Sequence, residues 1–310
     1  MLRGLLITIM TMAIVSAATA QSSDVDSDKP FLKLAESAND LKSLNLMQSQ
    51  QACAGLSKDA ESGIYYLNVS PAGQPVQTTF VFCNNEIEAS GRVGGWTLVW
   101  SNLRGGRDDP STDLSWGASI QTLPRYTGTF LPQDPNVGLQ SFEVFTGLRW
   151  WTAIAGQGSD AELVYEWAAN YSSPRNVDQR AFCEYRLDSY DSYSIRFNSN
   201  TCLQLIGAAG LPGLFVSHSG ARWSTMDRDN DIYTGHCAQM YSRTPFWYQA
   251  CWSGSINGGG EDYGGDHSNG AYWTGSATGW ASPQPDTQAE GAGSGWIYIR
   301  PLGAGHPKGN

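Results

Sequence analysis

The sequence predicts an α+β domain in which short β-strands and irregular loops dominate. Hydrophobic residues make up 41% of the 310 residues and charged residues only 15%, a composition that can form a packed core. Short runs of alternating apolar and polar residues recur along the chain, as is typical of half-buried strands. The 35 glycines and 14 prolines indicate many turns and loops around these runs.

The first 20 residues have the features of a secretory signal peptide. Arg3 precedes an apolar run from Leu5 to Val15, and Ala18-Thr19-Ala20 provides a cleavage site of the small-x-small kind. We therefore expect a signal peptide at residues 1–20. No later segment has the about 18 to 20 apolar residues that a membrane span requires. The protein is expected to be secreted and extracellular, with no membrane span.

Residues 21–52 are expected to form a polar leader with a short helical tether. Four apolar residues follow a 3-4-3 spacing that makes a narrow seam: Phe31, Leu34, Ala38 and Leu41. Asn45 and Gln48 occupy the next seam positions, and the seam is too short for a stable coiled coil. The tether is expected to pack on its own domain or to fray.

Strand patterns begin after Cys53 and recur to the end of the chain. The expected strands are 64–69, 76–83, 96–100, 163–167, 182–187, 193–197 and 296–300. Trp96 is expected to be a core residue. Residues 303–310 are expected to form a loose tail.

The densest group of candidate functional residues lies between residues 215 and 258. Asp227, Asp229 and Asp231 alternate, so in an extended backbone their side chains project to one side. Close carboxylates repel one another unless a cation lies among them, and calcium suits such oxygen ligands. An EF-hand starting at Asp227 is excluded because Ile232 and Ala238 replace its glycine and glutamate. The alternative is a solvated acidic turn.

The motifs around these carboxylates are specific. S-T-M-D-R-D-N-D (224–231) is followed by H-C-A (236–238), F-W-Y-Q-A-C (246–251) and S-I-N-G (255–258). Earlier motifs are S-G-I-Y-Y-L (62–67) and G-G-W-T-L-V (94–99). Together they resemble the fibrinogen-related (fibrinogen C-terminal-like) domains, in particular the lectins of the ficolin and tachylectin type, without a collagen region. The resemblance covers residues 53–302.

The resemblance implies a fold and a disulfide scheme. The fold is a twisted, mainly antiparallel sheet with short helices and a loop-rich C-terminal subdomain held by calcium and disulfides. Six cysteines in a secreted chain indicate three bridges. Proximity in the sequence and the family pattern together favour Cys53–Cys83 and Cys237–Cys251. Cys183 and Cys202 remain as the third pair.

The resemblance also implies site residues. The calcium ligands would be the carboxylates of Asp229 and Asp231 and the backbone carbonyls of Tyr233 and Gly235, with Asp227 outside the first coordination sphere. A ligand pocket would be lined by Tyr248, Ala250, Cys251, Trp252, Tyr263, Tyr272 and Trp273. In the lectins of this family a cis peptide precedes the second cysteine, and the corresponding bond here is Ala250–Cys251. The tyrosine of the family's L-N-G-x-Y motif is replaced by Gly260.

Composition and motifs also limit the function. A formal charge of −10 argues against nucleic acid and anionic membranes as partners, so neither is expected. The four histidines accompany no common catalytic motif, so no enzyme is expected, although a glycosidase needs only two carboxylates and stays open. Asn170 begins a sequon, Asn170-Tyr171-Ser172, and is expected to be glycosylated.

The function expected from the resemblance is that of a secreted, calcium-dependent lectin. It would bind glycans bearing N-acetyl groups, with innate immune recognition as its role. One such pocket would bind only weakly, with roughly millimolar affinity, so a homo-oligomer is expected. The alternative is a fibrinogen-like extracellular protein that binds another protein and no sugar.

Overall fold

The computed structural model describes residues 52–71, 74–102, 115–123, 125–128, 142–155, 160–168, 177–188, 191–207, 211–242, 245–251, 254–255, 272–273 and 294–308. These residues fall in one compact unit, Leu46–Asn310. The predicted signal peptide, the helical tether and Asn170 lie outside the described residues.

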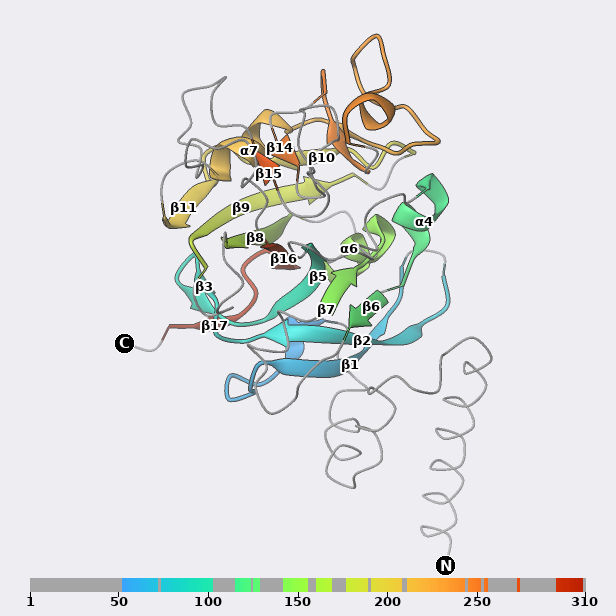
Figure 1. Cartoon of the computed structure of the whole chain (residues 1–310). Coiled ribbons are helices and arrows are strands. Elements are labelled where there is room, and N and C mark those ends of the chain that lie inside the picture. Colours follow the sequence, from blue (N-terminus) through green and yellow to red (C-terminus); the bar gives the residue numbers. More distant parts are fainter. Residues whose placement is uncertain are drawn as a thin grey trace, which may run out of the picture. The chain divides into compact units, whose positions relative to one another are not determined.

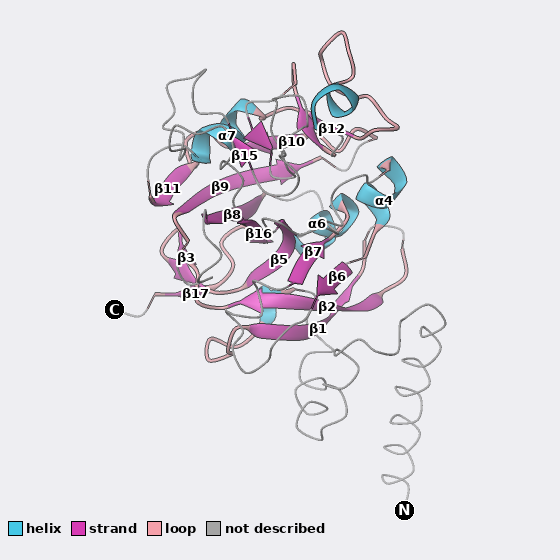
Figure 2. Cartoon of the chain, viewed as in Figure 1, coloured by secondary structure: helices cyan, strands magenta, loops and turns pink. Residues whose placement is uncertain are grey.

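The described elements are mostly strands (Figures 1 and 2). The strands are β1 (Gly63–Val69), β2 (Gln77–Asn84), β3 (Glu88–Ala89), β4 (Arg92–Val93), β5 (Trp96–Asn102), β6 (Arg125–Gly128), β7 (Phe142–Phe145), β8 (Ala161–Ala168), β9 (Gln179–Leu187), β10 (Ile195–Phe197), β11 (Leu203–Ile206), β12 (Arg222–Ser224), β13 (Phe246–Tyr248), β14 (Gly254–Ser255), β15 (Tyr272–Trp273), β16 (Ser294–Pro301) and β17 (His306–Pro307). The helices are η1 (Cys53–Gly55), α4 (Trp116–Gln121), α6 (Leu148–Ala155), α7 (Leu211–Ser217) and the π-helical η2 (Ala238–Ser242). The predicted strands are thus confirmed, with ends that shift by a few residues.

The main sheet is antiparallel and is completed by a strand from the C-terminal end of the chain. Its order is β1-β2-β5-β16-β8-β9-β10, with β11 paired to β9 and with β7 between β5 and β6. Strand β16, in dark red in Figure 1, pairs with β5 on one side and along its whole length with β8 on the other. Because β16 is a central strand and lies near the C-terminal end of the chain, the sheet is complete only when this late segment has joined the earlier strands.

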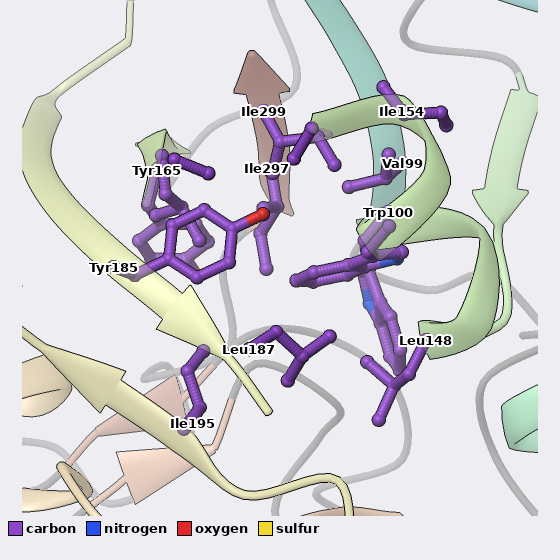
Figure 3. Packing of buried hydrophobic residues seen from close by; sticks show 14 of the residues in the cluster. Val99, Trp100, Leu148, Ile154, Tyr165, Tyr185, Leu187, Ile195, Ile297 and Ile299 are labelled. Carbon is purple, nitrogen blue, oxygen red and sulfur yellow. The ribbon is translucent and has the colours of Figure 1, made fainter. Parts of the chain in front are cut away.

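The hydrophobic core lies where α6 and α7 pack on the sheet. Strand β8 is buried along its whole length, because both faces of the sheet are covered. The apolar residues of α6 point to the core, and Trp100 of β5 lies beside this helix (Figure 3). Trp100 packs edge-on against Phe145 of β7 with ring centroids 4.9 Å apart. The rings and branched aliphatic side chains fill this layer densely, as protein interiors require.

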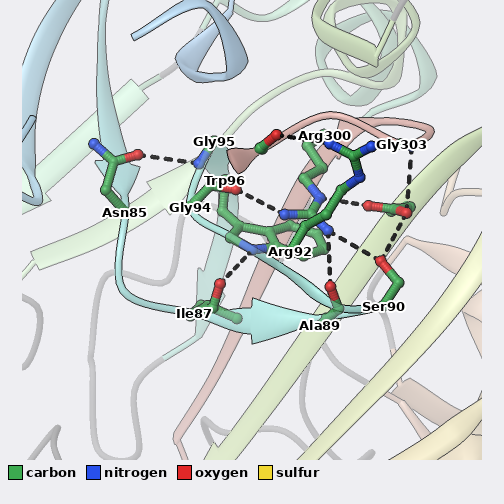
Figure 4. Close-up of polar contacts among 12 residues, drawn as sticks. Asn85, Ile87, Ala89, Ser90, Arg92, Gly94, Gly95, Trp96, Arg300 and Gly303 are labelled. Atoms are coloured by element: carbon green, nitrogen blue, oxygen red, sulfur yellow. Dashed lines mark hydrogen bonds and ion pairs between the residues drawn. The ribbon is translucent and has the colours of Figure 1, made fainter. Parts of the chain in front are cut away.

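A second buried cluster surrounds Arg300 on β16. Its guanidinium forms an ion pair with Glu162 of β8 and lies 4.0 Å over the ring of Trp96. It also donates hydrogen bonds to the carbonyls of Gly94 and Ala89 (Figure 4). Trp96 is fully buried, so its predicted role in the core is confirmed. The cluster joins the turns around β3 and β4 to the centre of the sheet.

The prediction of a loose C-terminal tail is wrong for residues 303–308. Gly303 and Gly305 adopt φ values of +69° and +85°, which turn the chain back, and β17 then pairs with β4. The ring of His306 contacts the Leu56 carbonyl at 3.1 Å, and Lys308 pairs with Glu88 at 2.9 Å. Glycine tolerates such φ values without strain, so the turn forms easily.

All six cysteines are paired as predicted. Cys53–Cys83 ties η1 to β2, and Cys183–Cys202 ties β9 to the segment before β11. Cys237–Cys251 closes the loop that contains η2 and β13. No free cysteine is left.

Candidate functional site

The candidate site is the loop between β12 and β13, and it stands on a rigid aromatic stem. The two strands pair antiparallel, with Trp223 opposite Trp247. Both indoles are buried, and their ring centroids lie 4.7 Å apart. Trp223 also packs edge-on against Trp100, so the stem is continuous with the core of the main sheet.

Polar contacts hold the loop to this stem. The side-chain amide of Asn230 donates to the Trp223 carbonyl at 2.7 Å, and the Asn230 backbone N–H donates to the Ser224 hydroxyl at 3.0 Å. The ring of His236 contacts the Thr225 carbonyl at 2.8 Å. These contacts fix the loop at both ends, before Asp231 and after Gly235.

Asp229 and Asp231 organise the segment between these ends. One carboxylate oxygen of Asp231 accepts from the Tyr233 N–H and the other from the Cys237 N–H, both at 2.9 Å. An oxygen of Asp229 accepts from the Asp231 N–H at 3.2 Å. The carboxylates of Asp229 and Asp231 therefore lie close to each other.

The donor set fits a hard divalent cation. Burial raises the pKa of Asp231, and the charge of Asp229 raises it further, although the Cys237 and Tyr233 N–H groups oppose this. A cation between the two carboxylates would relieve their repulsion. No described residue donates a hydrogen bond to the carbonyl of Tyr233 or Gly235, so both oxygens are available. In the described part of the chain no group of three His, Cys, Asp or Glu side chains is gathered, so a cation here would depend on these carbonyls.

Asp227 has a different role, which the sequence did not reveal. Its carboxylate accepts a 2.8 Å hydrogen bond from the backbone N–H of Trp116, at the start of α4, and a 2.6 Å bond from the Thr225 hydroxyl. Burial alone would raise the pKa of Asp227, but these two hydrogen bonds, together with its own backbone N–H and the charge of Arg228, lower the pKa. Arg228 stacks over the Trp116 ring at 3.8 Å. The two residues join the loop to a helix more than 100 positions earlier, a contact that no local pattern signals.

The second cysteine of the loop lies beside the acidic segment, but with a different backbone from the one expected. The N–H of Ile232 donates to the Gln249 carbonyl at 3.0 Å, which brings the acidic segment next to Ala250 and Cys251. The expected cis bond at Ala250–Cys251 is not present, since no cis peptide occurs in the described residues. Instead, Cys251 adopts φ +69°, a left-handed conformation that reverses the chain without a cis bond.

The aromatic residues predicted to line a sugar pocket have different fates. Tyr248 is fully buried with its neighbours Phe246 and Trp247 and packs edge-on against Phe246, which conflicts with a role in ligand contact. Tyr272 and Trp273 form β15, which pairs with β14 beside Cys251, and their side chains are not described. Trp252 and Tyr263 lie outside the described residues.

Three apolar side chains on the loop are exposed instead. Ile232 is 72% exposed, and Tyr233 and Met240 are each 41% exposed. Tyr233 and Met240 meet over Gly235, where a Cβ would lie 2.7 Å from the Met240 sulfur and 3.2 Å from the Tyr233 ring. These exposed apolar residues lie beside two carboxylates that form no ion pair with a described residue. Such a surface is more typical of a binding site than of a solvated turn. We call Asp229, Asp231, Ile232, Tyr233 and Met240 the loop face.

Comparison with known proteins identifies the class of fold. The chain has the fold of the fibrinogen-like globe of human ANGPTL2, with a TM-score of 0.52 at 23% identity over 81% of this chain and 99% of that one. It also matches a lamprey fibrin D-dimer in complex with the peptide Gly-His-Arg-Pro-amide. That match has a TM-score of 0.54 at 19% identity and covers all of this chain and 88% of the other.

Part of the sequence matches the model of a known family. Residues 168–287 match the model of the C-terminal globular domain of fibrinogen beta and gamma chains. Human angiopoietin-related protein 6 is 27% identical over 220 residues, which cover 69% of this chain and 38% of that protein. The chain contains a fibrinogen C-terminal domain and has homologues among the fibrinogen-related proteins. It spans about two fifths of the length of this relative.

Proposed function

We propose that this chain is an extracellular, non-catalytic recognition protein whose loop face binds another protein. Three disulfides fit an oxidising compartment. Among the described residues, no helix is long and apolar enough to cross a bilayer. Two of the relatives, human angiopoietin-related protein 6 and the rat fibrinogen gamma chain, have names that indicate neither an enzyme nor a lectin.

The exposure of Ile232, Tyr233 and Met240 is the observation that supports a protein partner. Protein interfaces depend on a few exposed aromatic or aliphatic side chains that become buried on binding. Of the aromatic residues expected to line a sugar-binding cup, Tyr248 is part of the core. The composition of the loop face therefore favours a peptide segment over a glycan.

The charge of the loop face defines the partner further. Asp229 and Asp231 form no ion pair with a described Lys, Arg or His. The apolar side chains of the loop face suit a segment with apolar residues, and in the calcium-free state the two carboxylates would also suit a basic residue. The peptide in the lamprey fibrin structure, Gly-His-Arg-Pro-amide, contains an arginine and is the natural probe.

Calcium would act as a structural support of this face. Asp229, Asp231 and the carbonyls of Tyr233 and Gly235 would hold it, and its charge would neutralise the carboxylates. A site with two charged ligands outside the cell is expected to have a dissociation constant of about 10⁻⁴ to 10⁻³ M. Ile232 and Tyr233 lie within the same segment, so their positions would depend on the cation.

Calorimetry on the secreted chain tests the calcium part. We expect Asp229→Ala to abolish calcium binding, because one of two charged ligands is lost. Asp227→Asn is the matched control, since an amide oxygen still accepts from Trp116 and Thr225. Equal calcium affinity in wild type and Asp229→Ala would disprove the site.

Titration with Gly-His-Arg-Pro-amide tests the recognition part. Ile232→Ser should weaken binding roughly tenfold, the loss expected for one buried aliphatic anchor. Val76→Ser is the control, because Val76 is similarly exposed but lies in the turn before β2. Calcium-dependent binding of N-acetylglucosamine, unaffected by Ile232→Ser, would contradict the proposal and favour a glycan partner.

A further inference from the structure

The packing of Met240 against the loop gives its sulfur an unusual position. Met240 lies in η2, outside the predicted calcium ligands, and is 41% exposed. Its sulfur fills the space that a side chain at position 235 would take, 2.7 Å from where a Cβ would be. The Tyr233 ring approaches the same point at 3.2 Å. The thioether therefore packs on two residues whose carbonyls are the proposed calcium ligands.

We propose that Met240 is a site of reversible oxidation by peroxides and that its oxidation loosens the loop and weakens calcium binding. The inference rests on the proposed calcium site. Met240 is exposed to solvent, so peroxide can reach it. It also contacts the loop, so a change in its side chain can affect the loop. Met226, in the same loop, is half-buried and thus less exposed than Met240. Its backbone carbonyl accepts a 2.9 Å hydrogen bond from the Gln239 side chain.

The chemistry needs only hydrogen peroxide as oxidant. A sulfur lone pair attacks one peroxide oxygen, the O–O bond breaks, an S–O bond forms, and water leaves. The sulfur loses two electrons and the peroxide gains them. The product, methionine sulfoxide, is polar and is reduced back by methionine sulfoxide reductases.

The sulfoxide does not fit the place of the thioether. The sulfur lies against Gly235, and the added oxygen makes this group larger and more polar. The side chain is therefore expected to leave this position for the solvent. The backbone from Tyr233 to Gly235 then loses the packing that holds it.

The consequence for calcium follows from the position of the two carbonyls. Both lie within the unpacked segment, so they are no longer held toward the carboxylates. Disturbing groups that orient metal ligands typically weakens metal binding by about 10- to 100-fold. Because Met240 is not itself a ligand, we expect the lower limit, roughly a tenfold rise in the calcium dissociation constant.

The experiment compares three secreted proteins before and after mild peroxide treatment: wild type, Met240→Leu and Met226→Leu. Peptide mass spectrometry measures oxidation at each methionine, calorimetry measures calcium binding, and hydrogen exchange follows the amides of residues 231–237. Leucine keeps the size and apolarity of the side chain but cannot be oxidised under these conditions. A sulfoxide reductase treatment of the oxidised wild type provides the rescue.

We expect peroxide to oxidise Met240 faster than Met226. In wild type and Met226→Leu, oxidation should weaken calcium binding about tenfold and speed exchange at residues 231–237, and the reductase should reverse both. In Met240→Leu, peroxide should change neither calcium binding nor exchange at residues 231–237. If the protein binds calcium before treatment, and peroxide then oxidises Met240 without changing either the calcium affinity or the exchange rates, the inference is overturned. If the untreated protein binds no calcium at all, the calcium site itself is disproved, which is a different result.

Discussion

Acidification should destabilise this domain through one buried histidine, His218. The residue follows α7, is buried, and packs edge-on against Phe246 of β13 with ring centroids 4.8 Å apart. Neither ring nitrogen forms a well-aligned hydrogen bond with a described group. Burial lowers the pKa of His218 from its ordinary value of 6.5 to about 4, and the Trp247 backbone only partly offsets this. The neutral ring is the form that fits the core.

The magnitude follows from linkage between protonation and folding. The folded pKa lies below the unfolded one, so below about pH 6.5 the unfolded chain takes up a proton that the folded chain refuses. Stability is therefore lost as the pH falls from about 6.5 to about 4 and, from this group, no further below that. At ~1.36 kcal/mol per pH unit, the loss reaches about 3 kcal/mol.

Urea denaturation with the disulfides intact, followed by tryptophan fluorescence at several pH values between 4 and 7.5, measures this loss. His218→Gln and His218→Phe should each remove about 3 kcal/mol of acid sensitivity, whatever they do to stability at pH 7.5. Phe246→Leu is the control, because it weakens the same packing without removing the titrating group. Its stability should be lower at every pH while its acid sensitivity stays that of wild type. If both His218 variants keep the acid sensitivity of wild type, the reasoning fails.

Two further predictions concern stability and use the same denaturation assay. Gly207→Ala should lower the free energy of unfolding by about 2 to 4 kcal/mol, because φ is +86° and a Cβ would collide with the Asp178 carbonyl. Gly220→Ala, at φ +82° with open space around it, should cost only about 1 to 2 kcal/mol, and equal losses would contradict the collision. Arg300→Met should lower the free energy of unfolding by about 3 to 5 kcal/mol, because it leaves the Glu162 carboxylate buried without its ion pair. Lys308→Met breaks an exposed pair with Glu88 and should cost less than about 1 kcal/mol. A similar small loss in both would show that burial of the Arg300 pair does not matter.

The strands and disulfides were predictable because their signals are local. Alternation identified β1, β2, β5, β8, β9 and β16, since burial on one or both faces selects apolar residues at regular spacing. Two of the cysteine pairs were predictable because proximity along the chain and a family pattern agree, and Cys183–Cys202 followed as the remaining pair. The short strands β3, β4 and β17 were missed. They contain only two residues each, so no periodicity can identify them.

The features of the site that were missed depend on contacts between distant segments. The hydrogen bond from Trp116 to Asp227 and the stacking of Arg228 on Trp116 join segments that no sequence pattern relates. The burial of Tyr248 was missed for a similar reason. Each aromatic residue of such a triplet favours the core when taken alone, but the cluster suggested that some would be exposed. The pairing of β13 with β12 places Tyr248 in the core. The exposure of Met240 likewise follows from the direction of η2 and not from its sequence.

The way the loop is held explains how calcium could control recognition without controlling folding. Asn230 and His236 fix the loop to the backbone of the β12 end by hydrogen bonds, and Cys237–Cys251 closes its far end. None of these contacts uses the carboxylate of Asp229 or the carbonyl of Gly235. The segment between them is the part whose geometry rests on two carboxylates that repel each other. A cation there would set the position of Ile232 and Tyr233, while the buried tryptophan stem would hold its place with or without the metal.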